Sequence, residues 1–124
     1  MNVIRHYNEW WWGRTYTLIT ADGMAMVELA IDVRDGRGDY GTIQSLMVHE
    51  SRRRQGIADA LIIKCEELAQ ELGLEQTVLN ALKNSWRIEW YRRLGYEIYD
   101  DTAEEGHVVS MQKFLETKKS ELWR

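Results

Sequence analysis

The sequence predicts an α/β (α+β) fold whose central twisted sheet is mixed and mostly antiparallel. Three observations support this class. The first half holds β-rich runs separated by Asp-Gly turns, apolar residues change to a helical period after Gly56, and a second helix with two further β-rich runs follows. With 124 residues, 44% hydrophobic and 29% charged, the chain is predicted to form a single domain over 1–124.

The first half predicts an antiparallel meander. Two β-rich runs cover 15–20 and 24–33, and the Asp22-Gly23 pair between them is typical of a hairpin turn. A second Asp-Gly pair lies within 33–40, and the run 41–48 is the next predicted strand. About 14 residues precede the first of these strands, and no strand is predicted there.

A helix is predicted from Ile57 to Leu72, because apolar residues recur there at three- and four-residue steps while glutamates and glutamines occupy the other face. Gly73 is placed to end it at the C′ position. The short apolar run 76–82 follows. A strand, a helix and a strand with this spacing predict a crossover between parallel neighbours.

A second helix is predicted over 86–94, with Asn84 or Ser85 as its N-cap and Gly95 as its stop signal. The runs 96–101 and 107–115 alternate well enough to be a closing pair of strands, separated by 102–106. The last residues, 116–124, are expected to form a helical turn.

Composition and charge exclude several classes of function. The net charge is −4 and the pI is near 5.4, which argues against nucleic-acid binding, since this normally needs a basic face. A single cysteine, Cys65, and the lack of a signal segment or apolar span predict a soluble protein of the reducing cytoplasm, away from membranes. The three histidines, 6, 49 and 107, lack metal-ligand spacing, so no metal site is predicted.

The stretch RRQGIA, residues 53–58, predicts an anion site at the start of the first helix. Backbone N–H groups of residues 54–59 lack intrahelical partners there, and the helix dipole adds to their effect. Gly56 has no Cβ, so a diphosphate could approach the backbone closely. The neighbouring arginines then supply local charge for phosphates rather than a surface for a duplex.

The segment VHESRRRQGIADALI resembles the pyrophosphate loop of the GNAT superfamily of acyl-CoA-dependent N-acetyltransferases, Gln/Arg-x-x-Gly-x-Gly/Ala, which is met by Arg53, Gly56 and Ala58. A second family segment, an asparagine followed seven residues later by a tyrosine and then Leu-Gly-aromatic, is matched by Asn84, Tyr91 and 94–96. The run 111–115 is similar to the family's last core strand. The resemblance spans 41 to about 115, and two motifs in order are more specific than the glycine loop alone.

The resemblance implies a GNAT fold, with a cofactor-binding helix after the fourth family strand and a second helix before the closing strands. It implies transfer of an acetyl group from acetyl-CoA to a primary amine in a ternary complex. Tyr91 would be the catalytic residue that protonates or hydrogen-bonds the departing thiolate. The implied cofactor-binding residues are Leu46, Met47, Val48, Arg53, Arg54, Gln55, Gly56, Ile57, Ala58, Asp59, Asn84 and Tyr91.

Some roles stay open at the level of sequence. Tyr91 could instead be a packing residue on the inner face of its helix, and Asn84 could be only an N-cap. The strand before the loop offers no carboxylate as general base, so Glu28, His49 or a bound water are the alternatives.

The front of the chain departs from the family, because it is too short for the two helices that usually line the acceptor site. The three tryptophans 10–12 are interpreted as cover for a sheet face or as an interface, which predicts a homodimer, with a cation–π surface for an amine as the alternative. Two functions therefore compete: an active acetyltransferase, and a non-catalytic GNAT-fold module that binds acyl-CoA or a protein partner.

Overall fold

The computed structural model describes residues 1–100 and 106–116. Within these residues, seven strands form one sheet, and two α-helices accompany it. In chain order the elements are β1 Val3–Trp10, β2 Gly13–Thr20, β3 Ala25–Asp32, β4 Tyr40–Val48, the 3₁₀ turn η1 Glu50–Arg52, α1 Ile57–Glu71, β5 Gln76–Leu82, α2 Trp86–Arg93, β6 Glu97–Asp100 and β7 Val108–Phe114.

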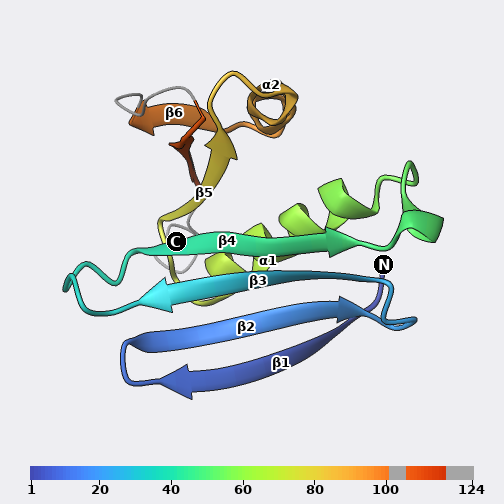
Figure 1. Cartoon of the computed structure of the whole chain (residues 1–124). Coiled ribbons are helices and arrows are strands. Elements are labelled where there is room, and N and C mark those ends of the chain that lie inside the picture. Colours follow the sequence, from blue (N-terminus) through green and yellow to red (C-terminus); the bar gives the residue numbers. More distant parts are fainter. Residues whose placement is uncertain (101–105, 117–124) are drawn as a thin grey trace.

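The sheet has the order β1-β2-β3-β4-β5-β7-β6. Neighbouring strands are antiparallel except β4 and β5, which are parallel and joined through α1. This confirms the predicted mixed, mostly antiparallel sheet and the predicted crossover. Figure 1 shows α1 passing along one face of β3 and β4, while β5 turns away from β4 toward α2.

The core lies between α1 and this face of the sheet. The buried face of α1 packs against apolar side chains from the middle strands, and the helix ends as predicted, with Leu72 as C-cap and Gly73 in the left-handed region. The fully buried members at the centre of this cluster are Val27, Leu29, Ile31, Leu61, Ile62, Cys65 and Leu68. Burial of this face holds α1 in place, and with it the loop at its N-terminus.

The first residues are the main correction to the prediction. They form β1, which pairs with β2 over its whole length, from Val3 opposite Thr20 to Trp10 opposite Gly13. All of β1 except Val3 is exposed, so there is no buried face to impose an alternation of apolar and polar residues. The strand is therefore defined by its partner, which the local sequence does not reveal.

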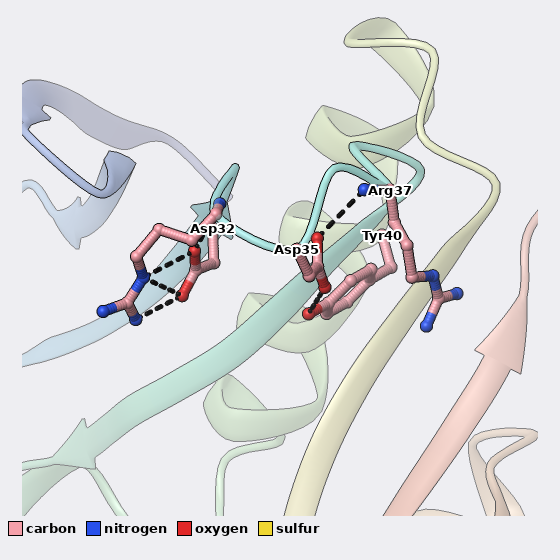
Figure 2. Close-up of polar contacts among 5 residues, drawn as sticks. Asp32, Asp35, Arg37 and Tyr40 are labelled. Atoms are coloured by element: carbon pink, nitrogen blue, oxygen red, sulfur yellow. Dashed lines mark hydrogen bonds and ion pairs between the residues drawn. The ribbon is translucent and has the colours of Figure 1, made fainter.

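The loop between β3 and β4 is closed by side chains of its own (Figure 2). The Asp35 carboxylate accepts the backbone N–H of Arg37 at 3.0 Å and the Tyr40 hydroxyl at 2.8 Å. At the start of the loop, Arg34 pairs with Asp32, the last residue of β3, at 2.6 Å. These contacts close the loop that leads into β4. The start of β4 is held to β5 by backbone bonds, since the Asp39 carbonyl accepts the N–H groups of Glu75 at 2.7 Å and Gln76 at 3.3 Å.

The closing strands agree with the prediction, and Gly95 follows the C-cap Leu94 of α2 with a positive φ of 99°. The loop predicted at 102–106 lies outside the described residues except Gly106, and of the tail only residue 116 is described. Among the described helices, none is long and apolar enough to cross a membrane.

Candidate active site

A cleft opens where β4 and β5 separate. The two strands are paired only from Tyr40 opposite Gln76 to Thr42 opposite Val78. Beyond this point β4 carries Ser45 in the left-handed region, with φ 55°, and its register with β3 shifts between Met26 and Glu28. A bulge of this kind bends a strand and interrupts its ladder. The result is a cleft of about 830 Å³ whose walls are the ends of β4 and β5, with α2 along one side.

Half of the residues predicted to bind the cofactor or to act in catalysis line this cleft. Three of them follow the bulge on β4, one belongs to the loop before α1, one to the first turn of α1 and one to α2. They are Leu46, Met47, Val48, Arg53, Ala58 and Tyr91.

The other predicted residues lie outside this lining: Arg54, Gln55, Gly56, Ile57, Asp59 and Asn84. All but Asn84 belong to the loop and first turn that begin α1. The chain there is tightly turned, with Arg54 at φ 65° and Gly56, the N-cap of α1, at φ 73°. A Cβ built on Gly56 meets no atom within 4 Å, so the space above this residue is open. The first helical bond runs from the Ala60 N–H to the Gly56 carbonyl, and the N–H groups before it are the free end of the helix.

Two of the three consecutive arginines are engaged by the protein itself. Arg52 pairs with Asp22 at 2.8 Å and ties η1 to the β2–β3 hairpin. Arg53 donates from Nε to the Val48 carbonyl at 3.2 Å and lines the cleft. Of the three consecutive arginines, Arg53 alone belongs to the cleft lining.

Tyr91 is 8% exposed and lines the cleft from α2. Its ring stacks on Trp90 with centroids 4.8 Å apart and meets Tyr96 edge-on at 6.2 Å. Burial raises the pKa of Tyr91 above its usual 10.0, and the nearby Arg87 offsets part of the change. The phenol therefore stays protonated at neutral pH and can donate a proton or a hydrogen bond. Tyr91 both packs in the core and lines the cleft. A packing role and a role in the cleft are therefore compatible for this residue.

Asn84 is not the N-cap of α2, which was one of the two roles predicted for it. Ser85, not Asn84, is the N-cap of α2, and no hydrogen bond from its side chain closes the helix. Asn84 precedes it at φ 62°, a conformation that asparagine adopts more readily than most residues. Its side chain is exposed near the end of β5. The N-cap interpretation of Asn84 was therefore wrong, and its contact with a cofactor stays a prediction.

Of the candidate bases, Glu28 is connected to the cleft. Its carboxylate accepts a hydrogen bond of 2.6 Å from Nε2 of Gln44, which lines the cleft next to the bulged Ser45. His49 instead caps η1: its Nδ1 accepts the backbone N–H of Ser51 at 3.1 Å. Of these two candidate bases, Glu28 is thus hydrogen-bonded to a residue of the cleft lining, whereas His49 bonds to Ser51 of η1.

Several cleft residues were missed by the sequence analysis. Asn80 lies on β5 and accepts a hydrogen bond of 2.9 Å from the Ser110 hydroxyl of β7. A polar residue within the apolar run 76–82 was the available signal. Trp86 and Trp90 also line the cleft, and the Trp90 indole N–H donates to Asp59 at 2.6 Å. No local pattern marks this last contact, because its partners are 31 residues apart.

A comparison with protein families identifies the family of this domain. The model of the acetyltransferase (GNAT) domain matches residues 13–98, which include the β4 bulge, the loop before α1 and α2. The chain belongs to the GNAT acetyltransferase family. The matched range is broader at the front than the resemblance found in the sequence, since it includes the whole β2–β3 hairpin.

Solved structures share the fold of this GNAT domain. The Bacillus subtilis acetyltransferase in complex with CoA has a TM-score of 0.67 and 18% identity, over 85% of this chain and 78% of that one. The PaiA N-acetyltransferase from Thermoplasma acidophilum, in complex with coenzyme A, has a TM-score of 0.62 and 18% identity, over 81% and 59%. Nourseothricin acetyltransferase has a TM-score of 0.63 and 24% identity, over 85% and 66%. No curated protein matched the sequence.

Proposed function

We propose that the cleft binds acetyl-CoA and that the protein transfers its acetyl group to a primary amine by direct attack in a ternary complex. The observation that carries the proposal is the separation of β4 from β5 beside the open N-terminus of α1. Such a site offers backbone groups of β4 to an extended ligand and backbone N–H groups to a diphosphate. We place this activity in the cytoplasm, and the whole of 1–124 in one domain.

The residues at the mouth of the cleft suit a diphosphate. The open space above Gly56 is where a Cβ would stand, so a phosphate could approach the backbone of residues 54–59. Arg53 lies at the same mouth and would add positive charge. The Asp59 side chain is turned toward Trp90, so the backbone N–H of Asp59 is the group we assign to the ligand.

Further into the cleft, the residues present suit a long, weakly polar ligand. Leu46, Met47 and Val48 follow the bulge along one wall, and we propose that their backbone pairs with the ligand as a strand would. Asn84, exposed at the end of β5, is proposed to contact the same ligand. When bound, acetyl-CoA supplies the activated thioester.

The chemistry asks two things of the protein. A base must take the proton that the amine nitrogen loses as it bonds to the acetyl carbon, and an acid must supply a proton to the sulfur as the carbon–sulfur bond breaks. We propose that Tyr91 is the acid, because it is protonated, buried and in the cleft. Glu28 is our candidate base, acting directly or through a water held by Gln44.

Binding is tested first, by titration calorimetry with acetyl-CoA. We expect micromolar binding to the wild type and none to Gly56→Glu, whose side chain would fill the space assigned to the diphosphate. Gly36→Glu is the matched control: Gly36 has a φ of 75° against 73° for Gly56, and a Cβ meets nothing within 4 Å at either position. Both variants bear the same backbone strain, so only Gly56→Glu should lose binding. Equal loss in both, or no binding to a folded wild type, contradicts the proposal.

Turnover is then followed as release of the CoA thiol in the presence of candidate amines. Tyr91→Phe should lower kcat by about 10²-fold, the usual contribution of a general acid. The variant keeps the aromatic ring that lines the cleft, so acetyl-CoA affinity should change much less than kcat. Acetyl-CoA binding without turnover of any amine would instead support the non-catalytic module.

A further inference from the structure

The two edges of the sheet are very unlike. One edge is β6, of four residues, and the other is β1, of eight. Within the described residues, β1 pairs only with β2. Its large apolar side chains are exposed: Ile4 at 51%, Tyr7 at 46% and Trp10 at 52%. A long apolar edge strand of this kind is a template for another strand, and proteins usually shorten, cover or charge such an edge.

The register with β2 determines which backbone groups of β1 face outward. Trp10 is paired with Gly13 across the two-residue loop 11–12, so these two residues exchange hydrogen bonds. Because bonded and non-bonded pairs alternate along an antiparallel ladder, the even residues of β1 bond to β2. The N–H and C=O groups of Val3, Arg5, Tyr7 and Glu9 therefore point away from the sheet.

The side chains of β1 are complementary to a reversed copy of the same strand. Arg5 pairs with Glu71 of α1 at 3.3 Å, so the odd residues of β1 lie on the α1 face of the sheet. In an antiparallel pair centred on Tyr7, residues 4–10 overlap, and Arg5 of each strand stands opposite Glu9 of the other. On the other face, Ile4 stands opposite Trp10. The pairs between odd-numbered residues, 5 with 9 and 7 with 7, have backbone N–H and C=O groups that point outward. These groups can form hydrogen bonds with the second strand.

Other registers are less favourable. A pair centred on His6 overlaps as far, over residues 3–9, but sets Val3 opposite Glu9 and His6 opposite itself. Pairs centred on Arg5 or Glu9 set like charges against each other, which destabilises a sheet. Charge complementarity therefore selects the register centred on Tyr7.

We propose that β1 pairs with β1 of a second copy of this chain, antiparallel and centred on Tyr7, so that two sheets join into one across a two-fold axis. Such an interface uses the same strand in both copies and closes after two, as most homo-oligomeric contacts do. It gives Arg5 and Glu9 partners in addition to their present ones, Glu71 and Tyr7. The inference is independent of the proposed acetyl transfer, because the cleft lies on the other side of β4.

The first test uses charge exchange, with the dimer measured by analytical ultracentrifugation. Arg5→Glu and Glu9→Arg each set like charges opposite one another at two symmetric places, so each should weaken dimerisation on the order of tenfold. The double variant with both changes restores opposite charges and should restore the dimer. Thermal melts and acetyl-CoA titration of the same variants separate a loss of pairing from a loss of folding or of the cofactor site.

The second test fixes the register by cross-linking. In the proposed pair the two Tyr7 Cα atoms are about 5.5 Å apart, within the span of a disulfide. Tyr7→Cys should therefore form a covalent dimer under mild oxidation, and the matched variant His6→Cys should not. Native Cys65 is fully buried and does not interfere. A monomeric wild type at high micromolar concentration, a dimer insensitive to charge exchange, or cross-linking through His6→Cys in place of Tyr7→Cys would each overturn the proposal.

Discussion

The Trp90 indole donates a hydrogen bond of 2.6 Å to the Asp59 carboxylate and so joins the first turn of α1 to α2. The loop before α1, residues 53–56, which we call the anion loop, is proposed to hold the diphosphate. Tyr91 of α2 is proposed to protonate the sulfur. Trp90 also stacks on Tyr91, with ring centroids 4.8 Å apart, and meets Trp86 at a tilted angle, with centroids 5.9 Å apart. One half-buried contact thus sets the spacing between the two ends of the candidate site.

We expect Asp59→Ala and Trp90→Phe each to lower the free energy of unfolding, because each removes one partner of the Asp59–Trp90 hydrogen bond. Much of the two losses should be shared. A hydrogen bond to a charged group contributes about 1.5–3 kcal/mol, so a double-mutant cycle by urea unfolding should show a coupling on the order of 1–2 kcal/mol. Additive effects in the cycle would mean that the contact does not hold the two helices together.

Glu28→Gln tests the proposed base. The amide keeps an oxygen that can accept the Gln44 bond but cannot take a proton from the amine, so kcat should fall by about 10²-fold. Acetyl-CoA affinity, measured by calorimetry, should stay as in the wild type. Glu97→Gln on the far edge strand β6 is the control and should leave kcat unchanged. If Glu28→Gln turns over normally, Glu28 is not the base.

A buried polar cluster ties α1 to the closing strands, and we expect it to contribute to stability. Lys113 pairs with Glu66 at 2.9 Å, and Glu66 also accepts the Tyr96 hydroxyl at 2.8 Å. Removing one partner of a buried ion pair costs about 3–5 kcal/mol, and the 30% exposure of the Lys113 side chain lowers our expectation for Lys113→Met to about 1–3 kcal/mol.

The double variant Glu66→Leu with Lys113→Met removes both charges of the ion pair, so no unpaired carboxylate is left at Glu66. It should therefore be less destabilised in urea than Lys113→Met alone. A double variant that is at least as unstable as the single one would show that the cost comes from packing rather than from an unpaired charge.

Stability should fall in alkali. Burial raises the pKa of Cys65 from 9.0 to about 12, and it also raises the pKa values of Tyr91 and Tyr96 above their usual 10.0. Below pH 9 these groups are protonated in both states, and their contribution is fully present. Above it the unfolded chain loses protons that the folded protein keeps, so the free energy of unfolding decreases by up to about 1.4 kcal/mol per pH unit and group.

Urea unfolding between about pH 8 and 11 measures this dependence. In Cys65→Ala the free energy of unfolding should no longer begin to fall near pH 9. The fall that begins near pH 10, which comes from the tyrosines, should remain. The slopes are compared rather than the absolute stabilities, since the substitution also opens a small cavity. A flat profile in the wild type would contradict the assigned burial effects.

Much of the fold could be predicted from the sequence because its signals are local. The helical period of 57–72 with Gly73 at its end, the Asp22-Gly23 turn and the apolar run 76–82 each act within a few residues, and each element formed where it was expected. The resemblance in the loop before α1 and in α2 placed the family correctly for the same reason, since both motifs are contiguous.

The sequence by itself therefore determined the α+β class, the crossover and the glycine at the start of α1. Only the tertiary structure decided that residues 3–10 form a strand, that Ser45 breaks β4 so that a cleft opens, and that Asp59 faces Trp90 rather than the anion loop. Each depends on a contact between segments: residues 3–10 need the backbone of β2, and Asp59 meets Trp90, 31 residues further along the chain. A local pattern records how a segment buries its own side chains, but it does not record which other backbone or side chain it will meet.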